Sequence, residues 1–263
     1  TPFAVISDKA NNRKYPIADY SLTPTVAIVD PALVLTVPGS VAADTGMDVL
    51  THATEAYVSQ MASDYTDGLA LQAIKLVFEN LESSVKNADF HSREKMHNAS
   101  TIAGMAFANA FLGISHSMAH KIGAQFHTVH GRTNAILLPY VIRYNGTRPA
   151  KTATWPKYNY YRADEKYQDI ARMLGLPAST PEEGVASYAK AVYELGERVG
   201  IEMNFKAQGV DEKEWKEHSR ELAFLAYEDQ CSPANPRLPM VDHMQEIIED
   251  AYYGYKERPG RLK

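Results

Sequence analysis

The stretch HSMAHKIGAQFHTVH (residues 116–130) contains four of the nine histidines of the chain, at positions 116, 120, 127 and 130. Neutral imidazole is the commonest protein ligand for divalent transition metals, and it also transfers protons near neutral pH. A single histidine is usually a surface or core residue. A cluster of this density among mostly apolar or small residues indicates a metal site.

The two ends of this stretch can bind one ion only if the chain turns between them. A helix advances about 1.5 Å per residue, so a continuous helix would place His116 and His130 about 21 Å apart. Gly113 ends the preceding helical pattern. We expect a turn near Thr128 and Gly131 that brings the two ends together.

A second pair of ligands is predicted in DTGMDVLTHATEAY (residues 44–57), which has the pattern of a helix. Asp48 and His52 are four residues apart, so they share a helix face with Cβ atoms roughly 5–6 Å apart. His116 and His120 have the same spacing and form an alternative pair. Asp48, His52 and any two of the clustered histidines would suit Zn²⁺ or Fe²⁺ and are too rich in nitrogen for Mg²⁺ or Ca²⁺. Spacing alone leaves the choice among the histidines open.

The composition is that of an ordinary globular protein. With 263 residues, 45% of them apolar and 22% charged, the chain can bury a large core. A net charge of −5 gives no field that attracts nucleic acid or an anionic membrane, so we expect neither as a partner. Cys231 is the only cysteine, which excludes an internal disulfide and favours a reduced, cytoplasmic setting. No apolar run approaches the ~20 residues that span a bilayer, and no signal peptide opens the chain.

Residues 1–37 form the β-rich part of the prediction. Residues 3–6 and 15–19 are predicted to pair as a hairpin. Residues 26–29 (VAIV) are apolar throughout, as expected of a strand that is buried on both faces. Because Thr1 leads directly into a strand-like run, we interpret the chain as a fragment whose strands complete a sheet located before Thr1.

From Pro38 onward the hydrophobic period is helical. The predicted fold class is therefore mostly α, with residues 1–37 as the remnant of one domain and residues 38–263 as an all-α domain. Residues 145–165 are expected to form a loop. The predicted helices span residues 48–61, 64–81, 92–111, 134–144, 166–174, 181–199, 211–227 and 240–252.

Three segments resemble the iron-containing (group III) alcohol dehydrogenases: GMDVLTHATEAYVS, FANAFLGISHSMAHKIGAQFHTVHGRTNAILLPYVIRYN and CSPANPR. The similarity runs over nearly the whole chain. TPFAVISD, KYPIADYSLTPTVAIVD and YEDQCSPANPRLP are most similar to the alcohol dehydrogenase half of the family's bifunctional aldehyde–alcohol dehydrogenases. The fold that the resemblance implies is a helical metal-binding domain, similar to that of dehydroquinate synthase, preceded by the last strands of an α/β nucleotide-binding domain.

The resemblance also implies roles for single residues. The family's metal ligands match Asp48, His52, His116 and His130. His120 matches a histidine near the nicotinamide that would relay the alcohol proton, so it would not be a ligand. The remaining matches are Lys14, Phe3, Val5 and Leu33 at the cofactor cleft, and Phe107 and Cys231 at the substrate pocket.

The chain departs from the family pattern at two points. Val129 stands where the family usually has proline before the last ligand histidine. The glycine-rich segments that cradle the dinucleotide phosphates lie in the family's N-terminal domain and are absent from these residues. His127 matches no family role, and we expect it to serve packing or the surface.

The activity that the resemblance implies is the NAD-linked interconversion of a short-chain primary alcohol and its aldehyde, ethanol and acetaldehyde being the expected pair. Fe²⁺, or Zn²⁺ in its place, would act as a Lewis acid while hydride passes directly between substrate and nicotinamide. The implied partners are the missing nucleotide-binding domain, a fused aldehyde dehydrogenase, and further copies of the chain in a homo-oligomer or filament.

Two other functions fit a cluster of metal ligands. A metal-dependent hydrolase would use the ion to activate water, but such sites often hold two metals bridged by carboxylates, and Asp48 is the only carboxylate among the motif residues. A helical assembly module could hold a structural metal. Structural zinc sites favour cysteine, although four protein ligands would close the coordination as such a site requires.

Overall fold

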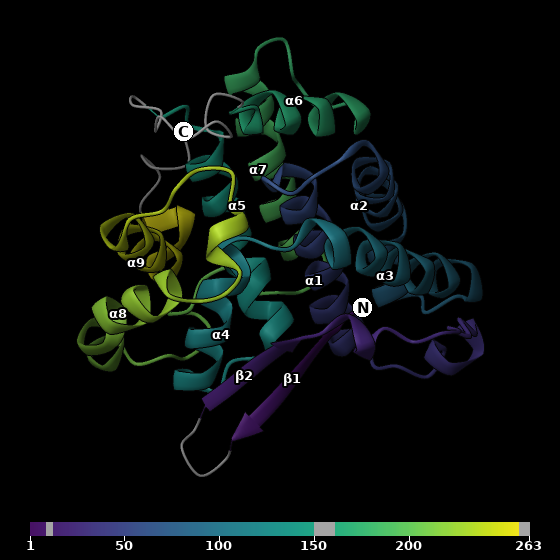
Figure 1. Ribbon diagram of the computed structural model, residues 1–263, viewed down its shortest axis with the longest axis horizontal. Helices are drawn as coiled ribbons and strands as arrows, with labels where there is room; N and C mark the ends of the chain where they lie inside the picture. The colour runs from purple at the N-terminus through teal and green to yellow at the C-terminus, as the bar shows by residue number, and fades with distance from the viewer. Residues whose placement is uncertain (9–12, 150–160, 258–263) are drawn as a thin grey trace.

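Two antiparallel strands open the chain, and helices make up most of the rest (Figure 1). The computed structural model describes residues 1–8, 13–149 and 161–257. β1 (Phe3–Asp8) pairs with β2 (Arg13–Ala18), and Phe3 lies opposite Ala18. The predicted hairpin and the predicted mostly helical fold class are both confirmed.

Nine helices follow in the described part of the chain. They are α1 (Gly39–Val58), α2 (Asp64–Lys86), α3 (Phe90–Ala110), α4 (Ile114–Phe126), α5 (His130–Gly146), α6 (Ala163–Met173), α7 (Pro181–Arg198), α8 (Glu212–Tyr227) and α9 (Val241–Glu257), with short 3-10 turns η1 (Tyr20–Leu22), η2 (Pro31–Val34) and η4 (Ser232–Ala234). Among them, α2, α3, α7 and α8 begin with a side-chain cap. Ser63 and Thr66 form a capping box at the start of α2. The Asp89 side chain accepts the backbone N–H of Ser92 at the start of α3. Such caps satisfy N–H groups that the helix itself leaves unpaired.

Helix α5 lies between two apolar clusters. One of its faces contributes Ala135, Leu138 and Ile142 to a core formed with α1, α2, α3, α6 and α7. The opposite face contributes Leu137 and Val141 to a second core with α4, α8 and α9. Figure 1 shows α8 and α9 on one side of α5 and α1 to α3 on the other. Burial on both faces fixes the position of α5, and so of the histidine at its first residue.

Within the described ranges, no single helix is long and apolar enough to cross a membrane. Taken together, α3 and α4 meet the requirements of length and composition, but they are bent by 107° at the break between them.

The prediction of a buried strand at residues 26–29 is wrong. These residues have no regular structure, and Val26 and Ile28 are 75% and 87% exposed. A strand buried on both faces needs neighbouring strands, and among the described residues β1 and β2 pair only with each other. Leu33 is also not at a strand end: it lies in η2 and is 75% exposed.

Several helix boundaries differ from the predicted ones. α1 begins at Gly39, nine residues before the predicted start at residue 48, because its first turns already bury Ala42 and Ala43. α5 begins at His130, four residues earlier than predicted. α6 begins at Ala163, inside the predicted loop at 145–165, of which residues 150–160 lie outside the described residues.

Candidate metal centre

The histidine stretch is two helices joined by a tight turn. α4 ends at Phe126, and His127 then adopts a left-handed conformation with φ 54°. α5 begins three residues later, at His130. The predicted turn is therefore confirmed. It brings the rings of His116 and His130 to a centroid distance of 5.4 Å, although the two residues belong to different helices.

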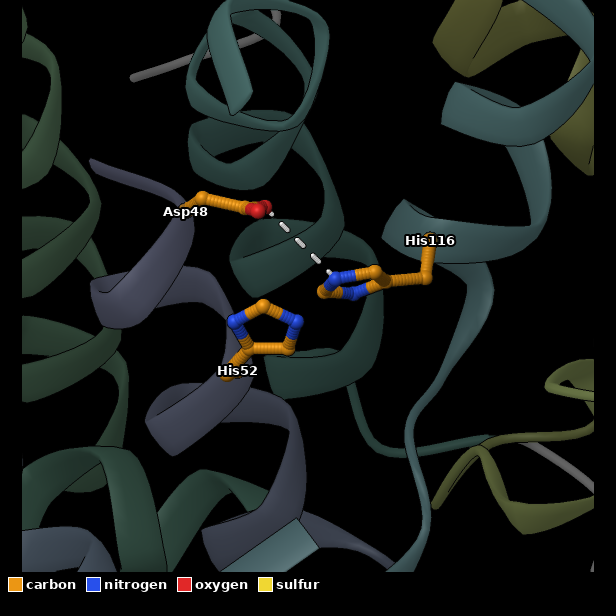
Figure 2. Close-up of side chains that lie close together, drawn as sticks. All are labelled: Asp48, His52 and His116. Carbon is orange, nitrogen blue, oxygen red and sulfur yellow. Dashed lines mark ion pairs between the residues drawn. The ribbon is translucent and has the colours of Figure 1, made fainter. Parts of the chain in front are cut away.

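Helix α1 supplies the other two candidate ligands, from one face as their spacing predicts. Figure 2 shows Asp48 and His52 of α1 pointing toward His116 of α4. Asp48 Oδ1 lies 3.6 Å from His116 Nε2 and 3.8 Å from His130 Nε2. The His52 ring lies 4.5 Å from the His116 ring. One candidate ligand atom from each of Asp48, His52 and His116 lies within 4.8 Å of the other two.

Gly131 permits the close approach of α5 to α1. A Cβ atom at this position would lie 2.2 Å from the carbonyl oxygen of Asp44 and 3.1 Å from Asp48 Cβ. Any larger residue would separate the helices, so glycine is required next to the last candidate ligand. Asn134, one turn further along α5, donates its amide to Asp48 Oδ1 at 2.8 Å. The same amide nitrogen lies 3.2 Å from His130 Nε2.

His116 is held by a buried carboxylate. Its Nδ1 lies 2.6 Å from Oε2 of Glu55, which is on α1 one turn after His52. The His116 side chain is 1% exposed and that of Glu55 is 2% exposed. In the described part of the chain, His116 Nε2 is buried and has no hydrogen-bond partner. A buried nitrogen without a partner is costly, and binding to a metal ion would remove that cost.

Burial and neighbouring charges set the ionisation of these groups. Burial, together with the nearby His52 ring, lowers the pKa of His116 well below its usual value. Burial acts to raise the pKa of Asp48, but His52, His130 and His116 outweigh it and the net shift is downward. A neutral imidazole and an ionised carboxylate are the forms that bind metal. Burial also raises the pKa of Glu55 to about 7, against the hydrogen bonds from the backbone of Ser115.

His120 lies beside this cluster, but its side chain is hydrogen-bonded to a residue outside it. Its ring stacks on that of His130 with a centroid distance of 5.4 Å, and its Nδ1 lies 3.2 Å from Asp229 Oδ2. Lys121 Nζ lies 2.7 Å from the same carboxylate oxygen. Burial acts to raise the pKa of Asp229, but the hydrogen bond and charge of His120, with those of Lys121, hold it well below the usual range.

Cys231 lies next to Asp229. Its backbone N–H donates to Asp229 Oδ1 at 3.0 Å, and its side chain is buried. One candidate ligand atom from each of His120, Asp229 and Cys231 lies within 4.8 Å of the other two. Burial raises the pKa of the Cys231 thiol well above its usual value, so the thiol is protonated. Since the Lys121 ammonium already pairs with Asp229, this second group is a poor cation site.

Aromatic rings form a wall beside the candidate ligands. Phe107 of α3 stacks on His52 with a centroid distance of 4.6 Å and an interplanar angle of 16°. Phe3 of β1 packs against Phe107 at 5.7 Å and against Phe111 at 5.8 Å. Of the predicted pocket and cleft residues, Phe107 therefore adjoins His52, and Phe3 packs behind Phe107.

Other predicted residues do not join the cluster or cannot be placed. The side chains of Val5 and Lys14 lie outside the described residues. Leu33 lies in the exposed segment before α1. His127 is exposed at the turn between α4 and α5, as expected of a residue without a ligand role.

Sequence reasoning missed three polar residues of the cluster: Glu55, Asn134 and Asp229. Glu55 follows His52 by three residues, and Asn134 follows His130 by four, so helical spacing could have placed each on the same face as a candidate ligand. Asp229 stands two residues before Cys231 in a loop, where spacing carries no such information.

The donor set fits a divalent transition metal. Asp48, His52 and His116 offer one carboxylate oxygen and two imidazoles within reach of one ion. His130 Nε2, 3.8 Å from Asp48 Oδ1, would add a third imidazole, and such a mixed oxygen and nitrogen set suits Fe²⁺ or Zn²⁺. Nε2 of His116 is buried and has no hydrogen-bond partner in the described residues. The nearest carboxylate oxygen, Asp48 Oδ1, lies 3.6 Å away, which is too far for a hydrogen bond. An ion bound between the two atoms would give this nitrogen its missing partner.

Comparison with known proteins gives three findings. Residues 42–252 match the sequence profile described as the Fe-containing alcohol dehydrogenase family, C-terminal. The chain is 97% identical over 263 residues to the aldehyde-alcohol dehydrogenase of Streptococcus pneumoniae serotype 2 (strain D39), and the match spans all of this chain but 30% of that protein. A crystal structure of 1,3-propanediol oxidoreductase superposes with a TM-score of 0.85 at 34% identity, and the match covers 96% of this chain and 62% of that one.

A further solved structure contains a dinucleotide. Sulfoacetaldehyde reductase from Bifidobacterium kashiwanohense, in complex with NAD⁺, superposes with a TM-score of 0.78 at 28% identity. The match covers 95% of this chain and 60% of that one. In each of these comparisons, the chain thus corresponds to less than two thirds of the matching protein's length.

Proposed function

The chain belongs to the iron-containing alcohol dehydrogenase family, in its C-terminal part, and on that premise we propose that it is the metal-binding half of an NAD-linked alcohol dehydrogenase. The reaction is the interconversion of a short-chain primary alcohol and its aldehyde, with ethanol and acetaldehyde as the expected pair. The observation that carries the proposal is the unpartnered, buried Nε2 of His116, which faces the carboxylate of Asp48. Membership of a dehydrogenase family disfavours both alternatives, the hydrolase and the structural metal.

Asp48, His52, His116 and His130 are the proposed ligands of the metal, with Fe²⁺ expected and Zn²⁺ as the alternative. When bound there, the ion supplies Lewis-acid chemistry to a substrate oxygen, and the nicotinamide supplies or accepts a hydride. The contribution of the chain is to hold its ligands in position. α1 and α5 are in close backbone contact at Gly131, and this contact holds Asp48 and His130 at a fixed separation.

His120 is the proposed proton relay. It adjoins the proposed ligand His130 at a ring distance of 5.4 Å, and its side chain is 10% exposed. Its Nδ1 faces the ionised carboxylate of Asp229, which leaves Nε2 free to exchange a proton with the alcohol oxygen. The Asp229 carboxylate also stabilises the imidazolium that forms when His120 takes up that proton.

The proposed substrate pocket has apolar and neutral walls. Phe107 stacks on one side of His52, and Phe3 packs against Phe107 in a tilted ring contact. Cys231, a protonated thiol, lies on the side of His120. Such walls suit a short alkyl chain and exclude water from the hydride path.

The proposed domain boundary lies between residues 37 and 38, with a nucleotide-binding domain before it that completes the dinucleotide site. The support is the fraction of its relative that the chain spans, 30%, and the exposure of Val26, Ile28 and Leu33. Exposed apolar residues in series suit a surface that another domain covers. A fused aldehyde dehydrogenase, a homo-oligomer or filament, and a cytoplasmic location complete the proposal.

Calorimetry and nicotinamide absorbance on two chain lengths test this proposal. We expect the 263 residues alone to bind NAD poorly and to oxidise ethanol negligibly, and the same residues with the upstream domain to do both. Zinc or iron assays on each length should give one metal per chain. Native-strength NAD binding by the short chain would contradict the missing domain, and metal-free turnover by the long chain would contradict the metal site.

A further inference from the structure

We propose that Glu55 is a positioning residue for metal binding: its buried carboxylate holds His116 in the orientation and tautomer in which Nε2 can accept a metal ion. This inference rests on the proposed metal site. It assigns a role to a residue that does not itself touch the ion.

The contact between Glu55 and His116 is short and sealed from water. Oε2 of Glu55 lies 2.6 Å from His116 Nδ1, and both side chains are at most 2% exposed. A short hydrogen bond to a carboxylate fixes both the direction of the ring and the position of its proton. With the ionised carboxylate as acceptor, Nδ1 carries the proton and Nε2 presents a lone pair, and this is the tautomer that the proposal gives to His116.

The other carboxylate oxygen is fastened to a helix that carries a ligand. Oε1 accepts the backbone N–H of Ser115 at 2.7 Å, at the first turn of α4. Gly113, the residue before α4, has no side chain that could cap the helix, and a Cβ there would lie 2.8 Å from Glu55 Oε1. Glu55 therefore replaces the missing cap from α1. It ties the helix of His116 to the helix of Asp48 and His52.

These contacts explain why the free nitrogen of His116 is directed as it is. The ring lies between two carboxylates of α1, with Nδ1 against Glu55 and Nε2 facing Asp48 Oδ1 at 3.6 Å. Without Glu55 the ring could turn over and place a protonated nitrogen toward Asp48. Outer partners that orient ligand histidines typically contribute about 10- to 100-fold in metal affinity.

Glu55→Gln separates the positioning role from simple loss of the side chain. A glutamine keeps the size of Glu55 but has one acceptor oxygen and an amide that donates. If the oxygen accepts from Ser115, the amide donates to His116 Nδ1 and favours the tautomer with the proton on Nε2, which cannot bind the metal. We expect the Zn²⁺ affinity of the metal-stripped chain, with its upstream domain in place, to fall by about 10- to 100-fold in competition calorimetry. The absorption spectrum of bound Co²⁺ should change as well, because the ligand ring is no longer held in one direction.

Asp164→Asn is the matched control. Asp164 is also a buried carboxylate, at 6% exposure, but it pairs with Arg148 on a different part of the molecule. This variant should bind Zn²⁺ with unchanged affinity and an unchanged Co²⁺ spectrum. If loss of a buried carboxylate lowered Zn²⁺ affinity only by destabilising the fold, both variants would lose affinity to a similar extent. A folded Glu55→Gln protein with unaltered Zn²⁺ affinity and Co²⁺ spectrum would overturn the inference.

A measurement on the unaltered, metal-free protein tests the tautomer even if the variant fails to fold. Nitrogen NMR of histidine-labelled protein should give a proton on Nδ1 of His116, assigned by its loss in His116→Ala. A proton on Nε2 would refute the role of Glu55. If instead His130→Ala leaves Zn²⁺ affinity intact, the metal site itself fails, so the two failures can be told apart.

Discussion

The imidazole rings of His120 and His130 are stacked, 5.4 Å apart and within 9° of parallel, yet each is tied to a different part of the chain. His130 contacts Asp48 and Asn134, so it belongs to the junction of α1 and α5. His120 bonds to Asp229, which follows α8. Proximity to the cluster therefore does not by itself make a histidine a ligand, and substitution can separate the two roles.

Replacing His120 by Gln should leave the metal in place and impair turnover. The enzyme with its upstream domain should retain one metal per chain, because the ligands are on α1, α4 and α5, while turnover falls by about 100-fold or more, as for loss of a general acid–base group. Metal analysis and the pH dependence of the rate provide the measurements. Loss of metal from His120→Gln would favour the His116 and His120 ligand pair instead.

Replacing His130 by Ala should abolish tight metal binding. Loss of a ligand should exceed the 10- to 100-fold typical of an outer partner, so we expect Zn²⁺ affinity to fall by more than about 100-fold. His127→Ala is the control from the same turn, since His127 is exposed. Its affinity should be nearly that of the original chain. Equal losses in the two variants would refute the ligand assignment.

Replacing Gly131 by Ala should force α5 away from α1. The added Cβ would stand 2.2 Å from the Asp44 carbonyl oxygen. Overpacking of this kind costs about 1–3 kcal/mol of unfolding free energy, and here it should lower metal affinity too. Urea denaturation measures the first effect and Zn²⁺ calorimetry the second.

Gly68 of α2 provides the control for that substitution, because nothing lies within 4 Å of a Cβ built there. Gly68→Ala should be neutral or stabilise the chain by up to about 1 kcal/mol, since alanine is the better helix former. A Gly131→Ala chain as stable as the Gly68→Ala chain would contradict the tight contact between α1 and α5.

Replacing Asp229 by Asn should destabilise the chain in a manner that depends on pH. Asp229 has a pKa below its usual value in the folded chain, because His120 and Lys121 together outweigh its burial. Its ionised form therefore stabilises the fold above the usual carboxyl range, and this contribution disappears as pH falls below that range. At pH 7 the loss should be about 2 kcal/mol, as for a hydrogen bond to a charged group.

Urea titrations at several pH values check this expectation. The stability difference between the two chains should be greatest near neutral pH and should shrink on acidification. Glu221→Gln alters an exposed carboxylate and should change little at any pH. A constant difference for Asp229→Asn across the acid range would show that its ionised form contributes nothing.

The parts of the site that follow helix periodicity could be predicted from the sequence. Asp48 and His52 share a face because they are four residues apart, and the same rule extends to Glu55 and Asn134. The meeting of His116 with His130 is harder to predict, because helical spacing says nothing about the direction of a turn. It depends on the left-handed conformation of His127. Residues other than glycine rarely adopt this conformation, so the sequence does not reveal it.

The rest of the site and one part of the fold depend on contacts between distant segments. Asp229 reaches His120 across 109 residues, and no local pattern encodes that meeting. Residues 26–29 have the composition of a buried strand, but strand formation needs partners, and the described residues provide none. Local sequence thus indicates what a segment can become, while the surrounding chain determines what it becomes.

The hydrogen bond from Asn134 to Asp48, which joins α5 to α1 across 86 residues, has a consequence for the kinetics of folding. Contacts between such distant residues require closure of a long loop, so we expect them to form late, after α1 has packed on its neighbours α2 and α3. An ion bound between α1 and α5 would then stabilise contacts that are absent from the transition state. Its effect should be to slow unfolding and leave the refolding rate unchanged. The metal would thus stabilise the folded chain after it has formed and would not help to start its folding.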